Sequence, residues 1–355
     1  MNTTIPITGT ILALDLGKYK TVACVYRGDP ATAPFVSLIT DRDHLGRLFE
    51  RYQPAVVVIE ACLLSGWVHD LCHQLGLACV VANTASEAWK FKHTKRKTDK
   101  DDALRLAQLY ALGQLPGVTV PDPATRQWRA LIATRQALVG RRVAVQNRIR
   151  ALLVGQGLPA PRGAKAWTES GLAGIGHYAL ALEQCAADQL WRGLLALALI
   201  EYRQVLELVR QAEQRLDALA RQAPAVHLLE SIPGVGPRTA ETVAAYLGDA
   251  KRFASAKQVS AYAGLVPRQY QSGELDRRGR ITRRGPALLR KLLVECAWCC
   301  LRYNAWARAV YLRLCRGHAH KKQAIVALAR KLLVHCWAML RDGTRWREPA
   351  PAAAG

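Results

Sequence analysis

The sequence lacks the features that direct a protein into a membrane or out of the cell. The apolar run Leu194–Ile200 is too short to cross a bilayer and is followed by Glu201. The first residues, Met-Asn-Thr-Thr-Ile-Pro, contain neither the basic segment nor the apolar segment of a secretory signal. The ten cysteines show no disulfide spacing. We therefore expect a cytoplasmic protein with reduced thiols and no membrane partner.

Acidic residues are scarce outside the first quarter of the chain. The whole sequence has 50 Lys and Arg residues against 27 Asp and Glu residues, a net charge of +23. Residues 1–90 contain seven basic and eight acidic side chains, so residues 91–355 contain 43 basic and 19 acidic ones. An excess of this size predicts a polyanionic partner. The first region is typical of a catalytic core and the remainder of a nucleic-acid-binding body.

The pattern of residues 1–120 predicts an α/β domain. Three early strands are followed by an alternation of helices and strands, which is the order of the ribonuclease H-like fold. The expected strands are Thr10–Leu14, Thr21–Tyr26, Pro34–Ile39, Ala55–Ile59 and Ala78–Ala82, with helices at residues 41–52, Trp67–Leu75 and Asp101–Leu112.

Residues 121–222 predict a long helical hairpin. One helix runs to Gly155, a Gly/Pro-rich loop follows to Gly176, and a second helix covers about Tyr178–Arg221. Arginines lie along the first helix, opposed only by Asp122, and the candidates for nucleic-acid contact are Arg141, Arg142, Arg148 and Arg150. The pair is either a coiled-coil or dimerisation arm, or an ordinary bundle with a basic face. Residues 223–345 predict a mostly helical C-terminal domain, and residues 346–355 a disordered tail.

Four acidic residues occupy positions typical of metal ligands in a nuclease. Asp15 and Glu60 each follow an apolar strand, and Asp99 and Asp102 are three apart at the start of a helix. Cleavage of a phosphodiester is assisted by two Mg²⁺ ions, which prefer carboxylate oxygens. Any one of these acids alone is explained by a turn, an edge charge or a helix cap. An acid at the end of each of two apolar strands favours the metal site.

The segment Ile232-Pro-Gly234-Val-Gly236-Pro-Arg238 lies between two predicted helices, Ala225–Ser231 and Arg238–Leu247. This is the form of a helix-hairpin-helix, in which glycines allow a tight turn and the exposed amides of the second helix hold a phosphate. Gly234, Gly236 and Arg238 are therefore candidate nucleic-acid contacts. A plain connection between two helices is the alternative.

Ser272 stands in Gln271-Ser272-Gly273, close in sequence to a group of arginines. The candidate phosphate contacts are Arg277, Arg278, Arg280, Arg283 and Arg284. A serine beside cations is able to attack a phosphate, because the cations stabilise both the alkoxide and the pentavalent transition state. The residues by themselves favour a turn serine, since no His or Lys lies close in sequence to remove its proton.

One group of residues has the C-x2-C…C-x2-H spacing found in zinc sites: Cys296, Cys299, Cys315 and His318. The alternative, which we favour, is that Cys296, Cys299 and Cys300 belong to an apolar core helix over Leu288–Leu301.

Taken together, these motifs resemble those of the DEDD-type insertion-sequence transposases, described as bridge-RNA-guided serine recombinases. The matching segments are the acids Asp15, Glu60 and Lys97-Thr-Asp99-Lys-Asp-Asp102-Ala, the arm Arg135–Leu153, the Ile-Pro-Gly-Val-Gly hairpin, Ala261-Tyr-Ala-Gly-Leu-Val-Pro267, Ser272-Gly273 and Gly279–Gly285. The resemblance extends over nearly the whole chain.

The resemblance implies a RuvC-like catalytic domain, a coiled-coil arm and a transposase domain that acts as a tetramer on donor and target DNA. It implies that Asp15, Glu60, Asp99 and Asp102 bind Mg²⁺ and that Ser272 of another subunit forms a phosphoserine link to DNA. A structured noncoding RNA would pair with both DNAs, and the protein would act at the bacterial nucleoid. The rival hypotheses are a Holliday-junction nuclease that uses water as nucleophile, and a non-catalytic nucleic-acid-binding protein.

Overall fold

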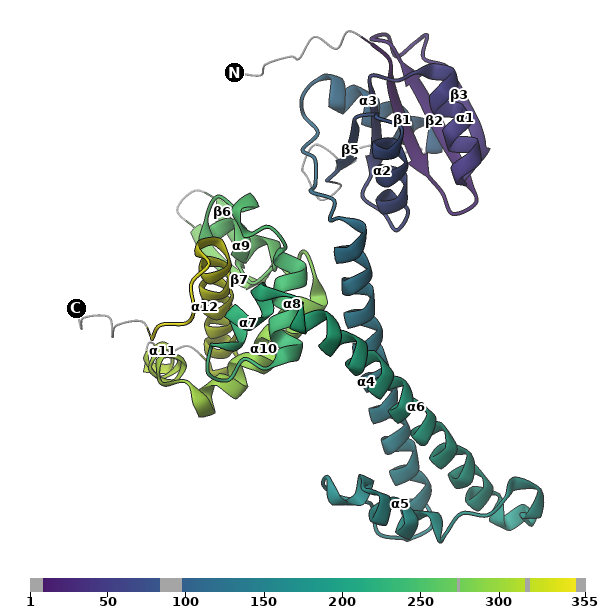
Figure 1. The fold of residues 1–355 in the computed structure, drawn as a ribbon, viewed down its shortest axis with the longest axis vertical. Helices are drawn as coiled ribbons and strands as arrows, with labels where there is room; N and C mark the ends of the chain where they lie inside the picture. The colour runs from purple at the N-terminus through teal and green to yellow at the C-terminus, as the bar shows by residue number, and fades with distance from the viewer. Residues whose placement is uncertain (1–8, 84–97, 273–274, 317–319, 349–355) are drawn as a thin grey trace. The chain divides into compact units, whose positions relative to one another are not determined.

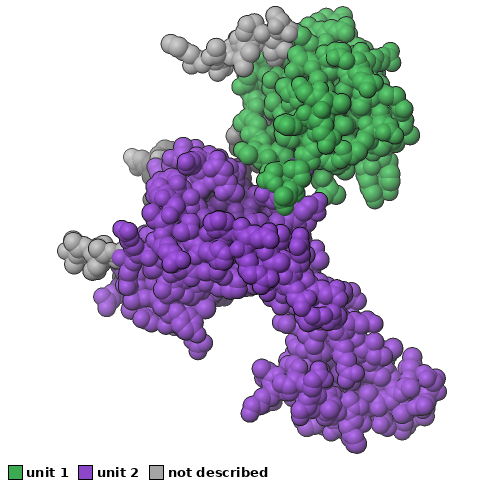
Figure 2. Space-filling view, viewed as in Figure 1, with its two compact units in different colours: residues 1–124 green, residues 125–355 purple. Residues whose placement is uncertain are grey.

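A computed structural model of the protein describes residues 9–83, 98–272, 275–316 and 320–348. For residues 270–272 and 275–278 it describes the backbone but not the side chains. The chain divides into two compact units, Met1–Ala124 and Thr125–Gly355 (Figure 2). The second unit contains both the long helices and the C-terminal helices, and the division of that region into separate domains stays a prediction.

The first unit is built on a five-stranded mixed sheet with the strand order β3-β2-β1-β4-β5 (Figure 1). Strands β1 (Ile11–Leu16), β2 (Lys20–Tyr26) and β3 (Phe35–Ile39) form an antiparallel meander. Strands β4 (Val56–Glu60) and β5 (Cys79–Ala82) then add in parallel beyond β1. This mixed α/β sheet is consistent with the ribonuclease H-like fold that the sequence predicts.

Alternation along the strands gives the sheet two apolar faces. Helices α1 (Arg42–Tyr52) and α2 (Ser65–Gln74) cover one face, where Leu12 and Leu14 of β1 are buried. Helix α3 (Asp99–Ala111) covers the other face, where Ile11 and Ala13 are buried. Residues of odd number in β1 therefore lie on the α3 side of the sheet.

The second unit begins with the helical hairpin. Helices α4 (Pro123–Val154) and α6 (Leu190–Arg221) run antiparallel, because Arg135 contacts Glu213 whereas Arg148 contacts Glu201. Their far ends share a small core with α5 (Glu169–Gly176), formed by Ile149, Leu172, Leu195 and others (Figure 1). The hairpin was predicted correctly.

Two boundaries in the hairpin were wrong. The segment expected to be a loop contains the short turn Lys165–Trp167 and helix α5. The second long helix begins at Leu190 instead of near Tyr178, because residues 182–184 and 187–189 form separate 3-10 turns. Thr168 caps α5 by accepting a hydrogen bond from the Gly171 amide at 3.3 Å, a local signal that the Gly-rich composition obscured.

The C-terminal helices enclose the largest apolar core of the protein. They are α7 (Pro224–Glu230), α8 (Pro237–Leu247), α9 (Ala256–Tyr262), α10 (Ala287–Tyr303), α11 (Ala305–Arg316) and α12 (Lys321–Asp342). Helix α12 crosses the centre of this group, with Leu328, Leu332 and Cys336 buried. Trp346, at the start of the predicted tail, packs against Trp306 with a centroid distance of 5.6 Å, so the described part of the tail is tied to the core.

Helix α12 is also the one helix in the described residues that is long and apolar enough to cross a membrane. Half of its apolar window is buried among the C-terminal helices, which is the environment of a core helix. Length and composition alone do not separate these two cases.

A β-hairpin interrupts the helices of the second unit. Strands β6 (Pro267–Ser272) and β7 (Leu275–Ile281) pair antiparallel, with a register shift between Pro267 and Gln269. The sequence favoured a turn at Ser272 and predicted no strand here, because arginines and glycines do not show the apolar alternation of a half-buried strand. The prediction of a mostly helical C-terminal region omitted this hairpin.

Candidate active site and nucleic-acid interface

Asp15 and Glu60 are neighbours on adjacent parallel strands. The β1–β4 register pairs Leu14 with Ile59, so Asp15 and Glu60 are the next residues along the two strands. Both follow the alternation that places Ile11, Ala13, Val56 and Val58 on the face covered by α3. The fold thus gives two acids, far apart in sequence, adjacent positions on one face of the sheet.

Helix α3 brings a third acid to that face. Asp102 is only 7% exposed and lies on the helix side that also buries Ala103 and Leu106 against the sheet. Asp99 lies one turn earlier and is exposed. The face of the sheet that carries Asp15 and Glu60 therefore also receives Asp102.

The start of α3 excludes the capping explanation for Asp99 and Asp102. Thr98 is the N-cap, and its hydroxyl accepts from the Asp101 amide at 3.2 Å while the Asp101 carboxylate accepts from the Thr98 amide at 3.1 Å. This capping box satisfies the helix end. Asp101 is therefore the acid of the capping box, and neither Asp99 nor Asp102 is the N-cap.

Carboxylates in this arrangement fit a hard cation by their chemistry. In the described residues, however, no group of three or more His, Cys, Asp or Glu side chains is placed to hold a metal ion. Mg²⁺ is commonly bound by one or two carboxylates, with water and substrate phosphate oxygens completing its shell. The donor set therefore fits a cation that is bound together with nucleic acid.

Ser272 is the last residue of β6, and its backbone pairs with that of Leu275 in β7. It belongs to the second compact unit, whereas the acids belong to the first. Its side chain and those of Arg277 and Arg278 lie outside the described part of the structure. Arg280, Arg283 and Arg284 are described, and all three are exposed.

The arginine segment after β7 is held tightly against the end of α9. Arg283 has a φ of +57°, a strained value for a residue other than glycine. A Cβ on Gly264 would lie 2.1 Å from the Arg284 carbonyl oxygen, and one on Gly285 would lie 1.9 Å from that of Tyr262. Glycine is therefore required at both positions.

Arg290 fixes the same segment from α10, and sequence reasoning missed it. Its guanidinium donates to the carbonyl oxygens of Ala263, Arg284 and Gly285, at 3.1, 2.8 and 3.1 Å. Burial lowers the pKa of Arg290. A single arginine inside a helix carries no signal in the sequence that separates it from solvated neighbours.

The Ile-Pro-Gly-Val-Gly segment connects α7 to α8 as predicted, with Gly236 as the N-cap of α8 and Pro237 at its first position. Gly234 has a φ of +92°, and a Cβ there would lie 2.9 Å from the Cys300 Cα. Nothing lies within 4 Å of a Cβ built on Gly236. Gly234 thus has a packing role, whereas the space beside Gly236 is open.

Arg238, a predicted nucleic-acid contact, is engaged within the protein. Its guanidinium donates to Glu241 of its own helix, at 3.2 Å to each oxygen, and to Asp217 of α6. Its side chain is 20% exposed. These bonds connect α8 to the helical hairpin.

The arm arginines are also partly occupied. Arg141 and Arg148 both donate to Glu201 on α6, and Arg150 lies over the Trp167 ring at 5.0 Å. Arg142 is half-buried, and within the described residues its Nε atom has no hydrogen-bond partner. Along residues 122–154, Asp122 is the only acid that opposes the arginines. The acid that engages Arg141 and Arg148 comes from α6, across the hairpin.

The cysteine cluster does not form a zinc site within the described residues. Cys296 and Cys300 are buried, with their sulfurs 3.9 Å apart, whereas Cys299 is exposed and was wrongly expected in the core. His318 lies outside the described residues. One helical turn separates the buried pair, which places Cys299 on another side of α10.

Two family models match most of the chain. Residues 226–312 match the model described as the transposase IS116/IS110/IS902 family, and residues 12–156 match the DEDD transposase model of the IS110 type. The putative transposase y4rJ of Sinorhizobium fredii is 30% identical, over 82% of this chain and 78% of the relative. The transposase for insertion sequence element IS1111A of Coxiella burnetii is 32% identical, over 82% and 79%.

The chain belongs to the IS110 family of transposases. The first model includes the turn before α8 and ends in α11, and the second includes Asp15, Glu60, Asp99 and Asp102. The pilin gene-inverting protein of Moraxella lacunata matches over a shorter segment. It is 37% identical, over 32% of this chain and 36% of the relative. The protein is thus a DNA-binding transposase of an insertion sequence, and its DEDD-type domain indicates use of a divalent metal.

Proposed function

We propose that this transposase cuts and rejoins DNA through a phosphoserine intermediate, with Ser272 as nucleophile and Asp15, Glu60, Asp99 and Asp102 as ligands for two Mg²⁺ ions. The observation that supports the proposal is that Asp15, Glu60 and Asp102 lie on one face of the sheet, while Thr98 and Asp101 form the capping box of α3. The acids and Ser272 belong to different compact units, so a complete site requires their assembly within one subunit or between subunits.

Each step of the proposed reaction exchanges one phosphoester bond for another, so no external energy source is needed. The Ser272 oxygen forms a bond to phosphorus as the bond from phosphorus to a deoxyribose oxygen breaks. The serine proton goes to a base, and the displaced oxygen becomes a free hydroxyl. In the second step the hydroxyl of another strand attacks the phosphoserine, releases the serine and restores a phosphodiester. Divalent cations would stabilise the charge on the transferring phosphate.

The partners proposed for this activity are donor DNA, target DNA and a structured guide RNA. The charge of residues 91–355, with 43 basic and 19 acidic side chains, supports polyanion binding. Gly236, at the start of α8, and the exposed Arg280, Arg283 and Arg284 are the proposed phosphate contacts of the C-terminal helices. The name of the Moraxella relative, which refers to gene inversion, supports conservative strand exchange.

The proposed homo-oligomer, a tetramer, is supported by an apolar row on α6. Leu190, Leu194 and Leu197 are spaced like residues on one helix face, and their exposed fractions are 47, 49 and 49%. An exposed apolar row on a long helix is typical of a coiled-coil contact.

The decisive experiment is a search for a covalent adduct. The protein, purified with RNA expressed from the element's flanks, would be incubated with labelled element DNA and Mg²⁺ and then denatured. We expect labelled DNA to remain attached to the wild-type protein and to Ser170→Ala, which alters an exposed serine of α5. We expect no attachment to Ser272→Ala.

Cleavage by Ser272→Ala, together with no adduct from the wild-type protein, would overturn the serine mechanism. That result would instead support a junction nuclease that uses water as nucleophile. Unchanged recombination by both Ser272→Ala and Asp102→Asn would overturn catalysis by these residues altogether.

A further inference from the structure

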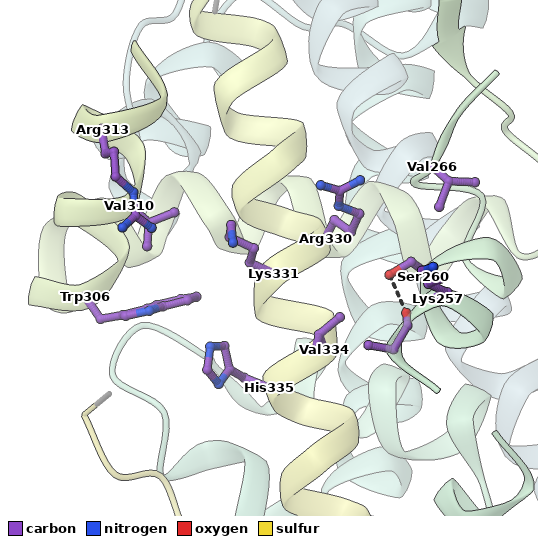
Figure 3. A pocket seen from close by; sticks show the side chains of 11 residues that line it. Lys257, Ser260, Val266, Trp306, Val310, Arg313, Arg330, Lys331, Val334 and His335 are labelled. Atoms are coloured by element: carbon purple, nitrogen blue, oxygen red, sulfur yellow. Dashed lines mark hydrogen bonds between the residues drawn. The ribbon is translucent and has the colours of Figure 1, made fainter. Parts of the chain in front are cut away.

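The C-terminal helices contain a cavity of about 380 Å³ to which the motifs of the family assign no role. It lies between α9, α11 and α12, and Figure 3 shows the side chains that line it. This volume falls within the roughly 300–1,000 Å³ typical of small-ligand sites. The cavity is therefore large enough for one nucleotide.

Basic side chains surround the cavity. Lys257 comes from α9, Arg313 from α11, and Arg330 and Lys331 from α12. No Asp or Glu lines the cavity, and within the described part of the chain none of these four cations forms a salt bridge. Acids on neighbouring helices are engaged elsewhere, since Glu295 pairs with Lys291 and Asp342 with Arg341. Four cations gathered without counter-charges favour an anionic ligand.

The floor of the cavity is apolar and aromatic. Val310, Val334 and the indole of Trp306 all line it (Figure 3). The Trp306 ring is held by edge contacts, with centroids 4.6 Å from His335 and 5.6 Å from Trp346. An oriented aromatic ring on an apolar floor is suited to a nucleic-acid base, because every base has a flat π-face.

His335 adds a polar edge to this floor. Burial, followed by the nearby Lys331, lowers the pKa of His335 and so favours its neutral form. A neutral imidazole has one donor and one acceptor nitrogen and is able to bind the edge of a base. The Ser260 hydroxyl, in contrast, is occupied by the Ala256 carbonyl oxygen at 2.7 Å.

We infer that this cavity binds one unpaired nucleotide of a nucleic-acid strand, with its base against Trp306 and His335 and its phosphates between Lys257, Arg313, Arg330 and Lys331. The inference rests on the proposed function, which supplies single strands during exchange and unpaired segments in a folded RNA. The same nucleotide chemistry comes from DNA or from RNA, and the experiment separates the two.

The test compares two double variants that lose the same charge. Lys257→Gln with Arg313→Gln changes two exposed cations of the cavity, and Lys321→Gln with Lys322→Gln changes two exposed cations of α12 outside it. Binding of an eight-residue oligouridine and of oligothymidine would be measured across a salt series. Loss of two phosphate contacts should reduce the slope of log affinity against log salt by about 1.4. We expect this loss only in the cavity variant.

A loss with RNA alone or with DNA alone would identify the source of the nucleotide, and a loss with both would support the cavity for either strand. Equal binding by both variants and the wild-type protein would overturn the inference.

Cross-linking provides a second readout that needs no variant. The wild-type protein would be irradiated with oligomers that carry 4-thiouridine or 5-iododeoxyuridine, and we expect the labelled peptides to include Trp306 or residues 257–266. Labels confined to other peptides would contradict the proposal.

Failure of this inference is distinct from failure of the proposed function. A wild-type protein that forms the Ser272 adduct, with a cavity variant that binds strands normally, would remove only the cavity proposal. A cavity variant that loses strand binding, with no adduct in the wild-type protein, would remove only the serine mechanism.

Discussion

Arg238 donates to both carboxylate oxygens of Glu241 at 3.2 Å, although the Glu241 side chain is only 1% exposed. The same guanidinium reaches Asp217 on α6, and Arg135 of α4 donates to Glu213 beside this group at 2.9 Å. Acids and arginines of three helices thus form one network at the junction of the hairpin and α8. Removing one charge from such a network leaves another without its partner.

This network predicts a dependence of stability on pH. Burial raises the pKa of Glu241 from 4.5 to about 7, and Arg238 and Arg135 oppose the rise. The folded protein therefore holds this proton more tightly than the unfolded chain does. The resulting stabilisation is full below pH 4.5 and is lost as the pH rises through 7, with a limit of about 3 kcal/mol.

Glu241→Gln should flatten the fall in melting temperature between pH 5 and pH 8, because glutamine does not titrate. The control is Glu295→Gln, which removes an exposed acid that pairs with Lys291 at 3.8 Å. Its curve should run parallel to that of the wild-type protein. A parallel curve for Glu241→Gln would show that this carboxyl does not titrate in the interval.

Asp102→Asn should abolish DNA cleavage without unfolding the protein. Removing a residue that hydrogen-bonds to a metal ligand typically lowers activity about 10–100-fold. Removing the ligand itself should therefore lower activity further. Asp101→Asn is the matched control, since it changes the adjacent acid, which belongs to the capping box. It should cost about 1 kcal/mol in stability and retain cleavage. Plasmid cleavage and thermal unfolding measure the two effects, and equal losses of cleavage would contradict the assignment.

Gly234→Ala should destabilise the second unit more than Gly236→Ala does, because Gly236→Ala changes only the N-cap residue of α8. The first places a Cβ 2.9 Å from the Cys300 Cα at a φ of +92°. Strain of about 2 kcal/mol should lower the melting temperature by roughly 4–8 °C. At Gly236 nothing lies within 4 Å of the added atom. Similar melting temperatures for the two variants would show that the turn adapts to a side chain at Gly234.

Glu201→Gln should increase affinity for RNA by a few-fold if the arm binds it. The carboxylate accepts from Arg141 and Arg148, and these bonds lower its pKa, so the variant frees two exposed arginines. Glu207→Gln is the control, because Glu207 pairs with Arg210 on its own helix at 2.5 Å. Filter binding at several salt concentrations measures the difference. Equal affinities would assign Arg141 and Arg148 to joining the hairpin alone.

Most elements of the first unit could be predicted from the sequence within one or two residues. Apolar runs such as Val56–Ile59 are short, rich in β-branched residues and flanked by polar segments, which identifies them as strands buried on both faces. The β6–β7 hairpin was missed because most of its residues are polar and lack the apolar alternation of a half-buried strand. The Thr282 amide donates to the Val266 carbonyl oxygen at 2.8 Å, and Arg290 of a later helix holds the adjoining segment.

The sequence by itself determined the order of strands and helices along the first unit, the long hairpin, the excess of basic residues, and the candidate acids and serine. Tertiary structure alone decided which charges lie next to one another. Register made Asp15 and Glu60 neighbours, the capping box separated Asp101 from Asp102, and pairing across the hairpin engaged Arg148 with Glu201. The same reason applies to the cavity of α9, α11 and α12, whose cations come from three helices. An ion pair depends on distance in space, and residue spacing gives that distance only within one helix or strand.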